Sequence, residues 1–268
     1  MEDKSLRFLY GTRVGRGVLK LLIQPGPSRL AGRYLDSRFS RWLIRPFIRR
    51  NQLDLTEYEG EDFASFNAFF IRQKREEYRR IDMEPGHVIS PCDGHLSVHR
   101  IGADSRFQIK GIEYSVAGLL ADAALARRFE DGYCFIFRLT PRNYHRYCYI
   151  DGGTKEAQIF LPGVLHCVRP VACDRYPVYM QNSREYVLIH TENLGDVVQM
   201  EVGAMLVGRI RNHPAGPAVR RGQEKGYFQF GGSTIVALFE KGMVAPDERL
   251  RPDVETPVRM GERIGTRA

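Results

Sequence analysis

The sequence KGYFQFGGSTIVALFE occupies residues 225–240 and combines a glycine pair, a hydroxyl pair and an apolar run. Residues 235–239, Ile-Val-Ala-Leu-Phe, are typical of a buried strand. Gly231 and Gly232 permit backbone angles that are costly for other residues, so they predict a turn directly before that strand. The plainest interpretation is therefore a Gly-Gly-Ser turn that leads into the core of the protein.

The same turn also has a chemical interpretation, because Ser233 directly follows the carbonyl group of Gly232. If the fold twists this peptide, the Ser233 hydroxyl can attack that carbonyl and shift the chain from amide to ester. Elimination across Cα–Cβ of Ser233 would then leave dehydroalanine, which hydrolyses to an N-terminal pyruvoyl group. The residues of the turn alone leave both interpretations open.

The positive charge of the chain is concentrated at its N-terminus. The 268 residues carry a net charge of +8, and 43% of them are hydrophobic, which suits one generous domain or a core with an appended segment. Residues 1–50 hold twelve Lys and Arg against only Glu2, Asp3 and Asp36. We therefore expect an anionic partner, either a membrane surface or nucleic acid, at the N-terminus.

Residues 6–24 and 37–50 interleave apolar side chains with arginines, and the second segment contains Trp42, the only tryptophan. This pattern is typical of a basic amphipathic helix that lies in the plane of a membrane. The alternative is an ordinary amphipathic helix packed on the core. Nucleic-acid binding is a third hypothesis, which no accompanying motif supports.

No apolar run is long enough to span a bilayer, and no secretory signal is visible, so a peripheral protein is expected. The chain has five cysteines, an odd number, and contains no CxxC motif. This predicts neither a disulfide framework nor a metal site, and it favours a reducing compartment.

The remaining pattern predicts an α+β protein with a mainly antiparallel, β-sandwich or barrel-like core and basic amphipathic helices at its N-terminus. We expect a helix over residues 51–80, with Phe63, Phe66, Phe69 and Phe70 facing the core, and another over 116–129. Residues 241–268 are expected to be a polar tail on the surface. The predicted strands are 88–90, 96–101, 107–109, 133–139, 158–161, 186–191, 197–202 and 233–239.

Two further segments carry side chains suited to catalysis. Ser90-Pro91-Cys92-Asp93-Gly94 predicts a tight turn that presents Asp93, and a turn without chemistry is the alternative. Residues 139–148, LTPRNYHRYC, place His145 at the end of a strand. A lone histidine is usually structural, yet it is also the natural general base at neutral pH.

Taken together and in order, these segments resemble the phosphatidylserine decarboxylase family, from about residue 55 to 240. The matching pieces are Phe69-Phe70-Ile71-Arg72, Ser90-Pro91-Cys92-Asp93-Gly94, Lys110-Gly111 with Tyr114-Ser115, Pro141-Arg142-Asn143-Tyr144-His145-Arg146, Leu161-Pro162-Gly163, Asn182-Ser183-Arg184, Val202-Gly203-Ala204 with Val207-Gly208, and Gly231-Gly232-Ser233-Thr234.

The resemblance implies a proenzyme that cuts itself between Gly232 and Ser233 into a β chain and an α chain that stay together. It also implies an Asp93-His145-Ser233 relay, in which His145 deprotonates Ser233 and Asp93 orients the imidazole. Ser233 would become a covalent pyruvoyl cofactor, which forms a Schiff base with phosphatidylserine and yields phosphatidylethanolamine without a metal.

Three positions depart from the pattern of the family. A second histidine often stands where this chain has Cys148, so Cys148 is a candidate auxiliary acid. The usual Leu-Gly-Ser-Thr is here Gly231-Gly232-Ser233-Thr234, and an aspartate is often found at the position of Asn143.

The resemblance further implies two parts, residues 1–80 as a helical membrane-associating segment and residues 81–268 as the β-rich catalytic domain. The expected location is the cytoplasmic face of the cell membrane, with an anionic lipid surface and phosphatidylserine as partners and no nucleic acid. A homodimer is left open.

Alternatives to this function are a pyruvoyl-dependent decarboxylase of another amino-acid-headed lipid and a non-catalytic membrane-binding relative. A biotinyl or lipoyl carrier domain is a further alternative. It fails because Met205 is followed by Leu206, whereas a carrier needs a lysine at the hairpin tip.

Overall fold

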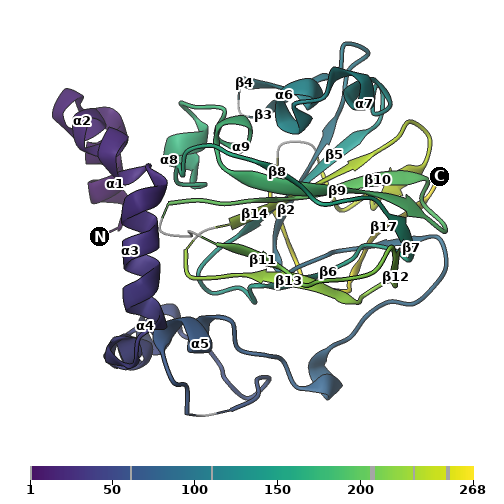
Figure 1. Ribbon diagram of the computed structural model, residues 1–268. Helices are drawn as coiled ribbons and strands as arrows, with labels where there is room; N and C mark the ends of the chain where they lie inside the picture. Colours follow the sequence, from purple (N-terminus) through teal and green to yellow (C-terminus); the bar gives the residue numbers. More distant parts are fainter. Residues whose placement is uncertain (1, 61, 110, 206–208, 232, 252–253) are drawn as a thin grey trace.

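A computed structural model of the protein describes residues 2–60, 62–109, 111–205, 209–231, 233–251 and 254–268. Lys110, Leu206, Val207, Gly208 and Gly232, which the sequence motifs include, lie outside these ranges. The described chain forms a β-rich core with a group of helices on one side (Figure 1). An α+β fold with mainly antiparallel sheets is confirmed, whereas the described strands do not close into a barrel.

Helices occupy most of the basic N-terminus, as predicted. They are α1 (Glu2–Gly11), α2 (Arg13–Leu22), α3 (Pro25–Asp36), the 3₁₀ helix η1 (Arg38–Leu43) and α4 (Ile44–Asn51). Thr12 caps α2 by accepting a hydrogen bond from the Gly15 N–H, and Pro25 begins α3, where a missing N–H costs nothing. In the described part of the chain, no helix has both the length and the apolar character needed to cross a bilayer.

The expected helix over residues 51–80 is wrong. The described residues of this range form only α5 (Phe66–Phe70) and the 3₁₀ helix η2 (Glu76–Tyr78). Polar side chains compete with a continuous helix: Asp54 accepts a hydrogen bond from the Thr56 N–H, and Ser65 caps α5. The aromatic residues nevertheless pack inward as expected.

The helix over residues 116–129 is divided into α6 (Val116–Leu120) and α7 (Ala123–Arg127). Ala121 takes a left-handed conformation with φ of 54°, and Asp122 caps the second helix. The two other short helices of the core are α8 (Pro170–Cys173) and α9 (Val178–Gln181).

The largest sheet has nine strands, and all its pairings are antiparallel. Its strands in spatial order are β12 (Ala218–Val219), β7 (Gly153–Lys155), β9 (Arg184–Thr191), β10 (Asp196–Val202), β14 (Ser233–Phe239), β5 (Tyr133–Leu139), β2 (Gly94–Arg100) and β16 (Thr256–Val258), while β8 (Ile159–Leu161) also pairs with β9.

Three smaller sheets complete the described fold. They are β1 (His87–Ile89) with β17 (Arg263–Arg267) and β15 (Val244–Pro246), then β11 (Ile210–Asn212) with β13 (Glu224–Phe228) and β6 (Arg146–Cys148), and finally β3 (Arg106–Ile109) with β4 (Ile112–Ser115). The expectation of a surface tail over residues 241–268 is therefore wrong. This segment supplies three strands, and its Val258 and Ile264 are buried in the core.

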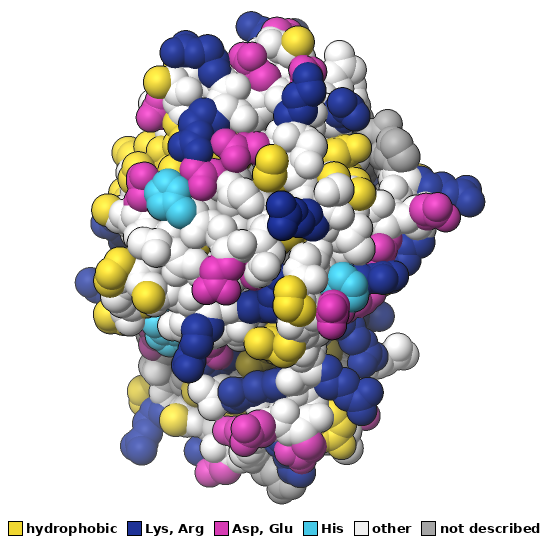
Figure 2. Space-filling view, turned by 90° about the vertical axis from the view of Figure 1, so that its right-hand side faces the viewer, with side chains coloured by type: hydrophobic (Ala, Val, Ile, Leu, Met, Phe, Trp, Pro, Cys, Tyr) yellow, Lys and Arg dark blue, Asp and Glu magenta, His cyan; other side chains and the backbone are white. Residues whose placement is uncertain are grey.

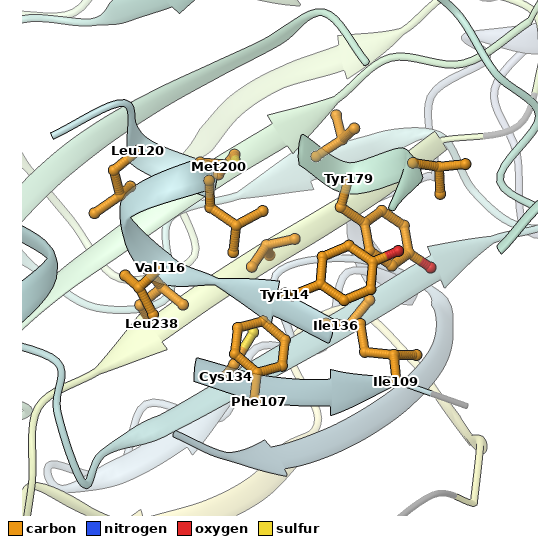
Figure 3. Packing of buried hydrophobic residues seen from close by; sticks show 14 of the residues in the cluster. Phe107, Ile109, Tyr114, Val116, Leu120, Cys134, Ile136, Tyr179, Met200 and Leu238 are labelled. Carbon is orange, nitrogen blue, oxygen red and sulfur yellow. The ribbon is translucent and has the colours of Figure 1, made fainter. Parts of the chain in front are cut away.

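Strand β14 lies between β10 and β5 and is buried on both faces, as its continuous apolar run predicts. On one face Val236 and Leu238 pack with α6, α9 and the β3–β4 hairpin (Figure 3). On the other face Ile235, Ala237 and Phe239 pack with residues of β1, β13 and β17.

Because both faces of β14 are buried, we expect Ile235→Ala and Leu238→Ala each to lower the free energy of unfolding by about 2–5 kcal/mol. Urea denaturation in a Ser233→Ala background, which is expected to keep the chain whole, would measure both losses. Ile159→Ala, at a side chain that is 41% exposed, serves as the control and should cost less than about 1 kcal/mol. A near-neutral result at either buried position would contradict the two-sided burial.

Candidate active site

The pairing of β14 with β5 fixes the position of Ser233. Ser233 is the first residue of β14 and lies opposite Leu139, the last residue of β5. The loop that follows β5 carries His145. Ser233 is fully buried, and its Oγ has no hydrogen-bond partner among the described residues. The preceding described residue, Gly231, has a φ of 138°, a conformation that favours glycine.

His145 is held by the backbone of its own loop. The Asn143 Oδ1 accepts hydrogen bonds from the Thr140 N–H and hydroxyl, both at 2.7 Å, which closes the loop. The Asn143 carbonyl lies 2.9 Å from Nδ1 of His145. Since a carbonyl oxygen only accepts, Nδ1 carries the proton and Nε2 presents a lone pair. Nε2 is buried and has no partner in the described chain.

The surroundings of His145 keep the imidazole neutral. Burial, and to a smaller extent the positive charge of Arg72, lowers its pKa to about 3, while the nearby backbone of Asn143 and Gly231 acts in the opposite direction. The contact with Gly231 brings the imidazole against the residue two positions before Ser233. The site therefore joins a buried hydroxyl and a neutral base, and no described residue forms a hydrogen bond with the reactive atom of either group.

Aromatic rings join the imidazole to the segment before Ser233. The ring of Phe70 lies 4.1 Å from that of His145, measured between centroids, and 5.1 Å from that of Phe230. Phe47 of α4 also contacts Phe230, with a centroid distance of 6.1 Å. The N-terminal helices and the candidate cleavage turn thus share one aromatic cluster.

Asp93 lies in the turn before β2 and pairs with groups other than His145. Its carboxylate accepts hydrogen bonds from Lys74 Nζ at 3.3 and 3.4 Å and from the Met260 N–H at 2.9 Å. No hydrogen bond between Asp93 and His145 occurs in the described structure. The connection is indirect, because Lys74 Nζ lies 5.0 Å from the ring centre of Tyr144, the neighbour of His145.

Cys148 lies on β6 and is fully buried. Burial raises the pKa of its thiol to about 12, so the thiol carries its proton at neutral pH. Its backbone N–H donates to the Pro91 carbonyl at 2.9 Å, which ties β6 to the turn that presents Asp93.

Sequence reasoning gave no role to Arg72 and Lys74, although both belong to the site. Arg72 is 2% exposed and Lys74 is 6% exposed. The available signal was their place directly after the aromatic residues at 63–70, which are expected to face the core. A cation buried beside them needs a charged or hydrogen-bonding partner.

A groove of about 830 Å³ reaches the segment before Ser233. Its walls come from α1, the loop after β5, the segment around α8 and the end of β10. Apolar side chains and three arginines share this lining. Its lining includes Leu6, Arg7, Arg169, Met205, Phe230 and Gly231.

Comparisons with known proteins identify the family of the chain. The sequence profile of the phosphatidylserine decarboxylase family matches residues 66–266. The chain is 43% identical to phosphatidylserine decarboxylase proenzyme 2 of Clostridium acetobutylicum, over 98% of this chain and 92% of that protein. It is 37% identical to phosphatidylserine decarboxylase proenzymes of Clostridium botulinum and Desulfitobacterium hafniense, over 99% of this chain and 93% and 92% of those proteins. The chain belongs to the phosphatidylserine decarboxylase family.

The neutral state of buried His145 should make the folded protein sensitive to acid. Because the pKa is about 3 in the folded state and near 6.5 in the unfolded state, the unfolded chain binds more protons between these values. The free energy of unfolding should thus fall as the pH decreases from 6.5 toward 3. His145→Asn keeps a donor for the Asn143 carbonyl but cannot titrate, so it should remove part of this dependence.

Urea denaturation at pH 7.0 and 5.0 would measure the effect, with both chains in a Ser233→Ala background. An equal loss of stability with and without His145 would show that this imidazole is not held neutral by the fold.

Proposed function

We propose that the chain is a proenzyme that cuts itself between Gly232 and Ser233 and that the pyruvoyl group formed from Ser233 is its cofactor. As a member of its family, the protein is a carboxy-lyase that decarboxylates phosphatidylserine. The observation that carries the proposal is a pair of buried groups that lack hydrogen-bond partners among the described residues, the Oγ of Ser233 and the Nε2 of His145. Gly232 itself lies outside the described residues.

In this proposal His145 is the base for self-cleavage. The Asn143 carbonyl fixes the tautomer, so Nε2 takes the proton from the Ser233 hydroxyl as that oxygen attacks the preceding carbonyl group. The conformation of Gly231 supports a twisted peptide at this place. Asp93 contributes its negative charge rather than a hydrogen bond, since Lys74 and the Met260 N–H occupy its carboxylate.

Cys148 is proposed as an auxiliary residue in a restricted sense. Its raised pKa makes the thiol a proton-bearing group and not a thiolate nucleophile. His145 therefore carries the base chemistry of the site, and Cys148 is available only as a weak proton donor.

The residues around Ser233 fit a pyruvoyl group. The side chain is enclosed, and its oxygen is bound to nothing in the described structure, so conversion of the hydroxyl removes no hydrogen bond. Once formed, the group supplies a carbonyl that takes up the electron pair released when CO2 leaves. The role of the surrounding chain is to hold the substrate amine at that carbonyl and to exclude water.

The groove beside Gly231 suits a phospholipid substrate. Leu6, Met205 and Phe230 provide apolar surface for the glycerol and acyl groups, while Arg7 and Arg169 provide positive charge for the phosphate. The combination favours an amino-acid-headed lipid. A free amino acid would leave the apolar walls of the groove exposed to water.

The N-terminal helices carry the surface that we propose lies on an anionic membrane at the cytoplasmic face. Their apolar side chains are unusually exposed: Phe39 by 76%, Leu21 and Leu30 by 71% each, and Trp42 by 67%. Arginines lie between them, which suits anionic head groups. The face of the molecule turned away from these helices instead shows side chains of both charges interspersed (Figure 2).

Intact mass spectrometry tests the self-cleavage. We expect the purified protein to yield two chains, residues 1–232 and the 36-residue segment 233–268 with an N-terminal pyruvoyl group. Ser233→Ala removes the attacking oxygen and should leave one uncut chain. A wild-type protein that remains whole after native expression would refute the proposal.

Vesicle sedimentation tests the membrane surface. Replacing both Phe39 and Trp42 by Ala should weaken binding to vesicles of phosphatidylglycerol and phosphatidylcholine by at least about 10-fold, because each buried aromatic side chain contributes roughly 1.5–3 kcal/mol. Stability should not change, since both side chains are exposed.

Phe160→Ala is the matched control, as this exposed aromatic lies on β8 of the core, and it should bind vesicles like the wild type. Equal binding by the double variant and the wild type would exclude this surface as the anchor.

A further inference from the structure

Asn67 is a buried polar residue within an apolar cluster. It is 3% exposed and lies on α5, where the neighbouring Phe66, Phe69 and Phe70 are all buried. Asparagine is a poor helix former, and a buried amide is costly unless its polar atoms are hydrogen-bonded. An apolar side chain would suit the packing of α5 better, so the presence of an amide indicates that its hydrogen bonds have a purpose.

Two hydrogen bonds fix the orientation of this amide. Its Nδ2 donates to Asp36 Oδ1 at 2.8 Å, and its Oδ1 accepts from the Phe230 N–H at 3.2 Å. A carboxylate only accepts and a backbone N–H only donates, so turning the amide over would lose both bonds. Asn67 thus joins the last residue of α3 to the residue directly before Gly231.

The amide lies where the hydrogen-bond ladder of β13 ends. Tyr227 of β13 pairs with Arg146 of β6, and the Phe228 N–H then donates to the His145 carbonyl at 2.9 Å. Two residues further on, the Phe230 N–H donates to a side chain, that of Asn67, instead of to a strand carbonyl. Asn67 therefore extends the anchoring of this segment beyond the strand, up to the glycine of the turn.

Asp36 and Arg209 complete a closed set of contacts. Asp36 Oδ2 lies 3.7 Å from Arg209 Nη1, and the Arg209 carbonyl accepts from the Gln229 N–H at 3.3 Å. Asn67 and Arg209 thus hold two consecutive N–H groups of the chain, and Asp36 contacts them both. The backbone before the turn is therefore fixed to the end of α3.

The turn beyond Phe230 requires such an anchor because glycine imposes little conformation of its own. Gly231 has a φ of 138°, and the next residue in the sequence is also glycine. On the far side of the turn, the register of β14 fixes Ser233 opposite Leu139. Attack by the Ser233 hydroxyl on the preceding carbonyl depends on alignment, and a displacement of about 1 Å can cost on the order of 100-fold in rate.

We propose that Asn67 is a positioning residue for self-cleavage: it holds the backbone of Phe230, and Asp36 orients its amide. The inference rests on the proposed self-cleavage. It gives the helical segment a part in the chemistry, because the cleavage turn is then anchored on one side by β14 and on the other side by the contact between α3 and α5.

The test follows the release of residues 233–268 over time from the full chain synthesised in a cell-free system. Asn67→Leu is similar in size and removes both hydrogen bonds, so we expect it to slow cleavage on the order of 10- to 100-fold. Asn67→Asp keeps an acceptor for the Phe230 N–H but places a second carboxylate against Asp36, so it should also be slow. Combining Asp36→Asn with Asn67→Asp again gives one donor and one acceptor at that contact, and it should recover most of the rate.

Asn193→Leu is the matched control. Asn193 Nδ2 also donates to an aspartate, Asp151, at 3.2 Å, but it lies between β9 and β10, before the end of β10 that pairs with Phe239. In the uncut Ser233→Ala background, Asn67→Leu and Asn193→Leu should lower the Tm by similar amounts, roughly 2–8 °C, because each removes a hydrogen-bonded amide. Only the change at Asn67 should slow cleavage.

Each alternative has a distinct result. Cleavage of Asn67→Leu at the wild-type rate would overturn the proposal. Slow cleavage of Asn193→Leu would show that the rate follows general stability, and this would overturn it too. If Asn67→Leu does not fold, the two exchange variants decide: a double variant as slow as Asn67→Asp contradicts the positioning role. If the wild type itself remains uncut, the proposed function fails, and the inference fails with it.

Discussion

The antiparallel pairing of β14 between β10 and β5 is the constraint on which the rest of the structure depends. Its register sets Ser233 opposite Leu139, and the loop after Leu139 then carries His145 back toward the same turn. Burial on both faces of β14 excludes water from the start of the strand, which lowers the pKa of His145 and leaves both reactive atoms without competing partners. The pairing of β14 therefore sets the position of Ser233, the burial of the site and the low pKa of His145 together.

The N-terminal helices are part of this arrangement. Phe47 of α4 and Phe66 and Phe70 of α5 surround Phe230, one residue before the glycine pair. Helix α1 forms a wall of the groove that leads to Gly231, and it is fastened to the core by Tyr10, whose hydroxyl accepts a hydrogen bond from the Cys167 N–H. The surface that we assign to the membrane and the turn that we assign to the chemistry thus rest on a shared set of contacts.

Local sequence patterns predicted those segments in which apolar residues recur with the period of one strand or one helix. The strand at 233–239 and the basic helices were visible because periodicity, burial and charge agree there. The strands β6, β11 and β13 were not predicted, since each mixes polar with apolar residues and is specified by its partners in the sheet. For the site, resemblance supplied Asp93, His145 and Ser233. It could not supply the pairing of Asp93 with Lys74 or the burial of Arg72, which depend on contacts between segments distant in sequence.

The 36 residues after the proposed cut contain β14 in the middle of the main sheet, β16 at an edge of that sheet, and β15 and β17, which belong to the smaller sheet with β1. While the chain is whole, this segment inserts as part of one molecule, at the cost of closing a loop. After a cut, refolding requires two separate polypeptides to meet. The high effective concentration that the intact chain provided is then lost, so reassembly is disfavoured in dilute solution. The mature protein would then persist through a high barrier to unfolding rather than through reversible equilibrium, so that its working lifetime is set by a rate.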